Sequence, residues 1–378
     1  LERSGLQARI YFPPSFMLTA EMLVSYMGSE PIDLLIILDK GTFAEYGTFH
    51  KYATEVMVID HHPPQGKQPD IFLFNPCLVE YNQASTSLLI HMINTLLGGR
   101  SLWSDFINLI GLKGDFAIEP VMGFIAPFCA PFYHDVSSQF PGLLETRVDK
   151  PTLFDVEQRE KTTGLSQITE LAHVVCGGGF QFFYHERDPE LAQLDEPMLL
   201  FKNLSSLKQN SEQLRKLATR KDFLRIIPDN VIFKRIFDHF EQDWADTFHF
   251  VDQAIPVAEI KDTVIFFFAG SNLKLLPMIG SVKSYQFKEN SQAGEVIGLY
   301  LNVTSNRIQL SARGTGSTVN CGLICRTLAE RVNLVSKGNR ASGGGHPKAA
   351  ECVMTDLHVP VSSILKELFT ILLELEEL

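Results

Sequence analysis

The stretch Ile32-Asp-Leu-Leu-Ile-Ile-Leu-Asp39 is an almost unbroken apolar run that ends on an acidic residue. A second run, Glu55-Val-Met-Val-Ile-Asp60, ends in the same way and continues into His61-His62. Apolar runs without polar alternation are typical of strands covered on both faces, as in a parallel sheet flanked by helices. The two runs predict a doubly wound α/β domain that binds its ligands at the carboxyl ends of the strands.

The neighbouring segments follow the same pattern, and residues 1–144 together predict this parallel-sheet domain. Further strands are expected at Ala8–Phe12 and Ile71–Phe74, and helices at Leu18–Met27, Ala84–Leu97 and Ser101–Lys113.

The rest of the chain predicts two more parts. Residues 145–254 contain few strand-like runs and many charged helical segments, of which Ser211–Ile227 is the clearest, so a mostly helical insertion is expected. Residues 255–378 predict a C-terminal mixed α/β domain. Its strands are expected at Thr263–Phe268, Val296–Leu301 and Arg307–Leu310, and its helices at Cys321–Leu334 and Ser362–Leu378.

Composition narrows the classes of function. The 378 residues are 45% hydrophobic and 20% charged, which excludes disordered and collagen-like chains. A net charge of −11 disfavours a uniformly basic nucleic-acid-binding surface, although a local basic groove remains compatible with it. Residues 121–133 form the longest nearly uncharged stretch, which is shorter than the ~20 residues of a membrane-spanning helix. With no secretory signal and no disulfide-type cysteine spacing, we expect a cytoplasmic protein without membrane contact.

Residues 202–235 contain nine basic side chains against three acidic ones. This stretch is interpreted either as a solvated helix face or as a docking surface for nucleic acid or protein.

Acidic and imidazole side chains stand directly after the two apolar runs. Asp39 ends the first run, Asp60-His61-His62 ends the second, and Asp115 closes Gly111-Leu-Lys-Gly-Asp115 after a predicted helix. Strands joined by a short crossover end side by side, so we expect these residues on one rim of the sheet. Carboxylates combined with imidazoles suit Mn²⁺, and two ions about 3.5–4 Å apart would serve phosphodiester hydrolysis.

A second group of candidate residues lies in the C-terminal part, in Gly343-Gly344-Gly345-His346-Pro-Lys348. Three successive glycines are predicted to form a tight turn whose N–H groups approach an anion, with His346 and Lys348 near it. Arg313, which precedes Gly314 after a predicted strand, is either a further phosphate contact or a plain turn residue. The histidines outside these two groups, His173 among them, have no companion at ligand spacing and are expected to be surface or core residues.

Several of these motifs resemble those of one known superfamily. Val58-Ile-Asp60-His61-His62 resembles the signature of the DHH phosphoesterases, and Asp39 and Gly111–Asp115 are similar to their neighbouring acidic motifs. Ser342–Ala350 resembles the glycine motif of the DHH-associated C-terminal domain. Length and layout are most similar to the archaeal RecJ-like proteins, which include a nuclease associated with the GINS complex.

The resemblance implies roles for individual residues. Asp39 would bridge two Mn²⁺ ions, with Mg²⁺ as the substitute, and His61 and Asp115 would ligate one of them. Asp60 would lie in or beside the metal shell, and His62 would contact the scissile phosphate. The glycine loop at 343–346, with Arg313 and Lys348, would hold the strand being degraded.

The resemblance also calls for an aspartate-rich DxDG-type turn, which the printed residues do not contain. Leu1–Gly5 is typical of the last turn of a helix closed by a C-cap glycine, so we expect this motif to precede Leu1.

These observations predict a Mn²⁺-dependent exonuclease that hydrolyses single-stranded DNA or RNA by a two-metal mechanism in DNA replication or repair. Without the first motif, the alternative is a non-catalytic GINS-binding scaffold of the replicative helicase. A phosphodiesterase for short oligonucleotides or cyclic dinucleotides is the third hypothesis.

Overall fold

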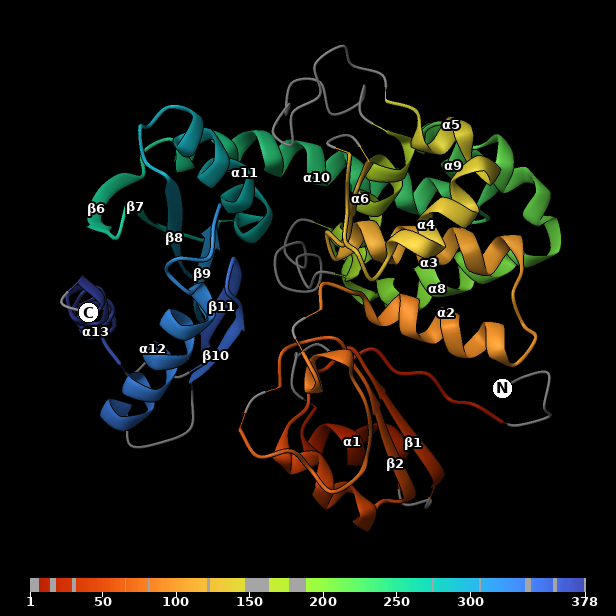
Figure 1. Ribbon diagram of the computed structural model, residues 1–378, viewed down its shortest axis with the longest axis horizontal. Helices are drawn as coiled ribbons and strands as arrows, with labels where there is room; N and C mark the ends of the chain where they lie inside the picture. The colour runs from red at the N-terminus through yellow and green to blue at the C-terminus, as the bar shows by residue number, and fades with distance from the viewer. Residues whose placement is uncertain are drawn as a thin grey trace. The chain divides into compact units, whose positions relative to one another are not determined.

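The chain, shown as a computed structural model in Figure 1, forms two compact units, Leu1–Phe237 and Asp238–Leu378. The long helix α10 (Asn230–Val251) contains the boundary between them. The structure describes residues 7–13, 18–28, 32–64, 66–80, 82–120, 123–146, 163–176, 188–273, 275–305, 307–336, 341–355 and 359–376. The predicted helix end at Leu1–Gly5 lies outside these residues, and the predicted boundaries after 144 and 254 stay predictions.

The first unit is built on a parallel sheet of three strands in the order β1-β2-β3, of which Figure 1 labels β1 and β2. These are β1 (Ile32–Leu38), β2 (Ala53–Ile59) and β3 (Phe72–Phe74). Ile37 lies opposite Val58, and Val58 lies opposite Leu73. Because all three strands run the same way, their carboxyl ends meet at one edge. The predicted α/β class with a parallel sheet is therefore confirmed.

One face of this sheet carries an apolar core. Helix α1 (Ala20–Met27) and the short 3-10 helix η2 (Ala44–Lys51) cover it. Tyr46 and Phe49 of η2 are completely buried in the same cluster as Val56 of β2. Burying a side chain of this size stabilises the fold by roughly 1.5–3 kcal/mol.

The opposite face of β1 is less well covered than an unbroken apolar run predicts. Leu34 and Leu38 keep 43% and 44% of their surface exposed. Their side chains point away from the core because successive residues of a strand face opposite sides of the sheet.

The remainder of the first unit is mainly helical. Described residues from 163 to 254 contain helices and no strand, which confirms the predicted helical middle region. The longer elements are α2 (Thr86–Leu96), α3 (Leu102–Gly114), α4 (Ala130–Val136), α5 (Pro141–Leu144), α6 (Gly164–Cys176), α8 (Glu196–Ser206), η8 (Leu207–Lys216) and α9 (Arg220–Ile226). The shorter ones are η3 (Pro76–Leu78), β4 (Ile118–Glu119), β5 (Phe124–Ile125), η5 (Ser137–Gln139) and η7 (Leu191–Gln193).

The second unit is a six-stranded mixed sheet in the order β10-β11-β9-β8-β7-β6, in which only β7 and β8 pair in parallel. Helices α12 and α13 share one apolar core with the sheet, in agreement with the predicted mixed α/β domain. The strands are β6 (Ile255–Ile260), β7 (Thr263–Ser271), β8 (Glu295–Val303), β9 (Ile308–Gly314), β10 (Ala341–His346) and β11 (Ala349–Met354). The helices are α11 (Leu276–Glu289), α12 (Cys321–Ser336) and α13 (Val361–Glu376).

The predicted strand Ala8–Phe12 is wrong. This segment is extended but pairs with no described strand. Its aromatic residues make ring contacts instead: Tyr11 stacks on Tyr26 of α1 at 4.9 Å, and Phe12 lies 6.4 Å from Phe201 of α8. Aromatic content favours a strand in the sequence, but here it serves side-chain packing rather than backbone pairing.

The predicted helix Ser211–Ile227 is wrong in its continuity, because it is interrupted between η8 and α9. Thr219 has extended backbone angles, and its hydroxyl accepts the N–H of Asp222 at 3.1 Å. A threonine in this position caps the start of a new helix.

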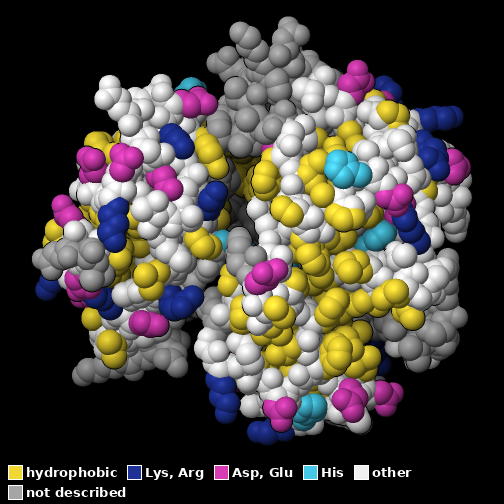
Figure 2. Space-filling model, in the orientation of Figure 1, with side chains coloured by type: hydrophobic (Ala, Val, Ile, Leu, Met, Phe, Trp, Pro, Cys, Tyr) yellow, Lys and Arg dark blue, Asp and Glu magenta, His cyan; other side chains and the backbone are white. Residues whose placement is uncertain are grey.

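No helix among the described residues combines the length and apolarity that a membrane crossing requires. On the face shown in Figure 2, the described lysine and arginine side chains are dispersed among acidic and hydrophobic ones.

Candidate metal centre

The strand ladder of the first unit continues into the candidate site. The N–H of Asp39 donates to the carbonyl of Ile59, and the N–H of Asp60 donates to that of Phe74, both at 3.1 Å. Asp39 has a φ of 59°, which is uncommon for a residue other than glycine and turns the chain sharply after β1. The residues after β1 and β2 are therefore held side by side at the carboxyl edge.

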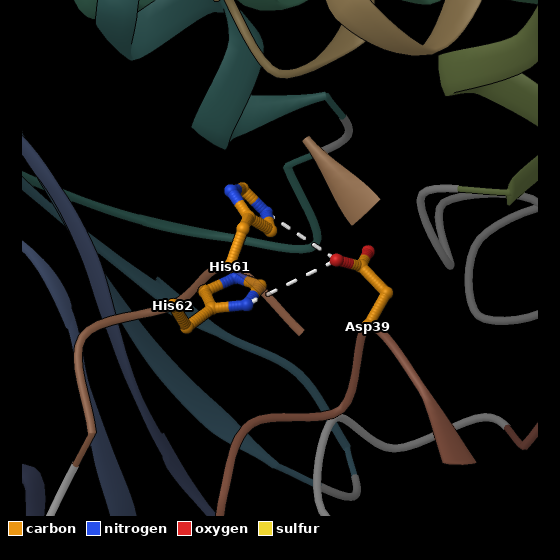
Figure 3. A group of neighbouring side chains, drawn as sticks. All are labelled: Asp39, His61 and His62. Atoms are coloured by element: carbon orange, nitrogen blue, oxygen red, sulfur yellow. Dashed lines mark ion pairs between the residues drawn. The ribbon is translucent and has the colours of Figure 1, made fainter. Parts of the chain in front are cut away.

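Asp39, His61 and His62 converge at this edge (Figure 3). The Nε2 atom of His61 lies 3.3 Å from Oδ1 of Asp39, and Nδ1 of His62 lies 3.9 Å from the same oxygen. One potential ligand atom from each of the three side chains falls within 4.8 Å of the others. His61 is buried, whereas half of the Asp39 side chain is exposed, so solvent reaches the group from the side of Asp39.

Asp115 lies next to this group. It caps the end of α3, and its Oδ2 atom is 3.8 Å from Nε2 of His61. His61 thus stands between two carboxylates that come from different elements. The fold brings together four of the predicted site residues, Asp39, His61, His62 and Asp115.

Asp60 lies behind the group and is completely buried. Its carboxylate accepts the backbone N–H groups of Gly41 and His62 and the side-chain amide of Asn75, at 3.1–3.3 Å. Its Oδ1 atom also lies 2.9 Å from Nδ1 of His62. A carboxylate only accepts hydrogen bonds, so Nδ1 of His62 carries a hydrogen and donates it to Asp60.

Two polar residues of the site are missed by sequence reasoning. Asn75 follows β3, and its side chain donates to Asp60 and to the carbonyl of His62. Thr86, the first residue of α2, donates its hydroxyl to Oδ1 of Asp39 at 2.8 Å. Asn75 stands at a strand's carboxyl end, a position that could have identified it. Thr86 carries no comparable signal.

The ionisable groups of the site shift one another's pKa. Burial acts to raise the pKa of Asp39, but hydrogen bonding to His61 and the charges of both histidines hold it well below its usual range. Burial acts to lower the pKa of His61, but its bond to Asp39 and the charge of Asp115 raise it to about 9. Burial, with the charge of Asp39, raises the pKa of Asp115 to about 7 against the opposing charge of His61.

These shifts mean that His61 carries a proton at neutral pH and partly neutralises the carboxylates. A divalent cation can take over that role once the proton leaves. Carboxylate oxygens with imidazole nitrogens form a donor set that fits Mn²⁺ or a similar first-row ion.

The predicted glycine turn of the C-terminal domain is wrong, because Ser342–His346 belongs to strand β10. The pairing with β11 places Gly343 opposite Cys352 and His346 opposite Ala349. A Cβ atom on Gly343 would lie 2.1 Å from the carbonyl oxygen of Cys325 in α12. Glycine in a strand often marks a place where another backbone comes close, and the packing of β10 on α12 accounts for Gly343 in this way.

The neighbouring glycines are constrained in a different way. Gly344 and Gly345 have φ angles of 152° and 135°, which residues with a side chain rarely adopt. A Cβ atom on Gly345 would also approach the backbone of Ala349 and Ala350 to 2.7 Å. His346, the last residue of the strand, is half-buried, and Lys348 beyond it is exposed.

Arg313 lies inside β9, and its side chain is hydrogen-bonded to other residues of the second unit. Its guanidinium donates to the carbonyls of Pro277, Ala312 and Ala350 and to the carboxylate of Glu351, at 2.8–3.1 Å. The structure therefore gives Arg313 a structural role within the second sheet. Arg313 and the glycine strand belong to the second unit, and the aspartate–histidine group belongs to the first.

No protein-family model matches the chain, and no curated protein matches it. Among solved structures, it is similar to RecJ from Thermus thermophilus in complex with Mn²⁺, at 15% identity and a TM-score of 0.47, over 90% of this chain and 45% of that one. The DHH domain of a member of a ribosomal-protein family gives 15% identity and a TM-score of 0.45, over 84% and 63%. CDC45 from Entamoeba histolytica gives 9% identity and a TM-score of 0.42, over 92% and 87%.

The chain thus spans less than two thirds of the RecJ and DHH-domain chains. The similar structures include DHH-domain and RecJ proteins, the group whose motifs the sequence resembles.

Proposed function

We propose that this protein is a metal-dependent phosphodiesterase that degrades single-stranded DNA or RNA from an end. The observation that carries the proposal is the convergence of Asp39, His61 and His62 at the carboxyl edge of the parallel sheet, with Asp115 beside them. Ligand sites of open α/β sheets lie at this edge.

Asp39, His61 and Asp115 would hold a divalent ion, Mn²⁺ or Mg²⁺. Such an ion supplies Lewis-acid stabilisation of the negative charge on a phosphodiester. His62 would contact the scissile phosphate, because its Nδ1 bond to Asp60 holds the ring at the carboxyl edge of the sheet, beside Asp39 and His61. Asp60 then supports the site from behind, since its oxygens already accept hydrogen bonds from Gly41 and Asn75.

The second unit would hold the nucleic-acid strand. Lys348 is exposed and positively charged, and His346 ends the glycine strand beside it. We place the phosphate contacts on Gly344, Gly345, His346 and Lys348 rather than on Arg313, whose guanidinium is already bonded to Glu351 and backbone carbonyls.

The test is a Mn²⁺-titrated degradation assay with single-stranded DNA and RNA, each labelled separately at its two ends. We expect Mn²⁺-dependent release of mononucleotides, with the labels reporting the polarity. Asp39→Asn and His61→Gln should each lower the rate by about 100-fold or more, because each removes a metal-ligand atom. The control is Asp33→Asn, which changes an exposed carboxylate on the same strand as the site.

Parent-like rates in both site variants would overturn the proposal. Asn and Gln are chosen because they preserve volume and hydrogen bonding. Asp60→Ala is unsuitable, because it would leave the N–H groups of Gly41 and His62 without their acceptor and cost folding stability as well as activity.

One observation favours a second candidate, a non-catalytic scaffold that docks onto the GINS complex. The described residues contain one group of three side chains that could hold a metal ion, Asp39, His61 and His62, which suits one ion rather than the clamp of two that phosphodiester hydrolysis commonly uses. A folded, Mn²⁺-replete sample that hydrolyses no substrate would favour this scaffold. Cleavage confined to the shortest members of a substrate length series would instead indicate an oligonucleotide or cyclic-dinucleotide phosphodiesterase.

A further inference from the structure

Helix α3 ends in an unusual way directly beside the candidate metal centre. The N–H of Phe116 donates to the carbonyl of Lys113, and the N–H of Ala117 donates to that of Leu112. These two bonds form a Schellman cap, with Asp115 as the capping residue. The position after the cap is normally glycine because its φ is positive, yet here Phe116 adopts a φ of 53°. The surroundings must therefore hold this cap in place.

His173 of α6 makes two contacts with the cap. Its ring stacks on that of Phe116, with centroids 6.2 Å apart and planes inclined by 26°. Its Nε2 atom lies 3.0 Å from the carbonyl oxygen of Gly114. A carbonyl only accepts, so Nε2 of His173 carries a hydrogen and donates it. The backbone bonds of the cap use the carbonyls of Leu112 and Lys113, and His173 satisfies the next one.

Two further contacts surround the same turn. Lys113 forms a buried ion pair with Glu119 at 2.8 Å, and its Nζ lies 5.2 Å from the centre of the Phe116 ring. Gln83 donates its side-chain amide to the carbonyl of Phe116 at 2.8 Å. The cap that carries Asp115 is thus fixed from several sides, and His173 is the contact that reaches the peptide joining Gly114 to Asp115.

We propose that His173 is a positioning residue that fixes Asp115 in place for metal binding. This inference rests on the proposed metal site, in which the Asp115 carboxylate and His61 act together. His173 touches neither the metal nor the substrate; it sets the orientation of the peptide from which the Asp115 side chain projects. Burial lowers the pKa of His173 to about 4, so the ring stays neutral and keeps a single tautomer at physiological pH.

The experiment measures Mn²⁺ affinity by calorimetry on the full chain, with three substitutions at His173. His173→Phe keeps the ring on Phe116 but has no donor, and His173→Asn is too short to reach the carbonyl of Gly114. His173→Gln places an amide N–H near the position of Nε2. We expect about 10-fold weaker Mn²⁺ binding for the first two, as is typical when a residue behind a metal ligand is lost, and affinity within about 3-fold of the parent for Gln.

The control is His91→Phe, which changes a buried histidine of the same unit that is bonded to Asp105 at 2.7 Å. This variant should bind Mn²⁺ like the parent even where it lowers stability. Circular dichroism verifies the fold of each variant, and if the Phe variant does not fold, the Asn and Gln pair decides.

The outcomes distinguish this inference from the function on which it rests. Parent-like affinity in the Phe and Asn variants, or an equal loss in the Gln variant, would overturn the role of His173 while leaving the metal site intact. A parent protein that binds no Mn²⁺ would overturn the metal site itself.

Discussion

His61 determines the charge balance of the candidate site. It lies 3.3 Å from Asp39 and 3.8 Å from Asp115, and only 6% of its side chain is exposed. Two carboxylates on either side of a buried imidazole favour its protonated form. The same arrangement favours a metal cation in place of that proton. His61 is therefore both part of the Asp60-His61-His62 motif in the sequence and a residue whose pKa the fold raises.

The raised pKa of His61 makes the stability of the metal-free protein dependent on pH. The folded protein binds the His61 proton more tightly than the unfolded chain does. Its contribution to the free energy of unfolding is therefore complete below the ordinary pKa of 6.5 and is lost as pH rises to about 9. The raised pKa of Asp115 acts mainly below about pH 7, and the buried thiols, whose pKa values burial also raises, contribute alike in the parent and in a His61 variant, so the difference between these two proteins from pH 7 to 9.5 reports His61. We expect the His61 contribution to the unfolding free energy, roughly 2 to 3 kcal/mol, to be lost over this interval.

Urea denaturation in EDTA at pH 7 and 9.5 measures this loss. His61→Gln should show a smaller change than the parent, because glutamine does not titrate. An identical pH dependence in the two proteins would mean that His61 is not protonated in the folded state.

Elements position the site in two ways. Parallel pairing of β1 and β2 brings Asp39 beside His61 and His62, as expected from the apolar runs and the residues that follow them. Asp115 instead arrives at the end of a helix, through a cap with an unfavourable backbone angle at Phe116. The glycines of β10 show the opposite case, because a motif that predicts a turn is accommodated in a strand packed against α12.

Close packing at Gly343 gives a prediction at the scale of this element. Gly343→Ala should lower the thermal unfolding midpoint, at a cost of about 1–3 kcal/mol, because its Cβ would meet the carbonyl oxygen of Cys325 at 2.1 Å. Gly47→Ala is the control, since the nearest atom to its Cβ lies at an ordinary 3.6 Å. Unchanged stability in the Gly343 variant would argue that this glycine serves ligand binding rather than packing.

At the scale of the whole molecule, the basic stretch at 202–235 is partly neutralised by its neighbours. Arg215 pairs with Glu212, Arg225 with Asp222, and Arg235 with Asp188 and Glu190. Exposed arginine pairs of this kind contribute little to stability, and they lower the net positive charge of the surface. The exposed lysines of the stretch are the side chains best suited to contact phosphates. These are Lys202, Lys216, Lys221 and Lys234, whereas the exposed Lys208 lies over the Trp103 ring, with its Nζ 4.6 Å from the ring centre.

If this stretch grips a nucleic-acid strand, replacing these four lysines by glutamine should flatten the salt dependence of binding. The slope of log affinity against log salt is expected to fall by about 0.7 for each phosphate contact removed from single-stranded DNA. Fluorescence anisotropy between 50 and 200 mM salt would measure it, with the exposed Lys51→Gln and Lys366→Gln as controls. An unchanged slope would assign the stretch to a solvated face.

The sequence by itself determined the parallel strands, the mixed α/β class and the rim on which Asp39, His61 and His62 meet. These follow from local hydrophobic patterns and from the rule that parallel strands end at one edge. Only the tertiary structure decided the burial of Asp60, the hydrogen bonds from Asn75 and Thr86 and the contact of His173 with the α3 cap. Such contacts join residues distant in sequence, and packing between elements creates them without any periodic signal.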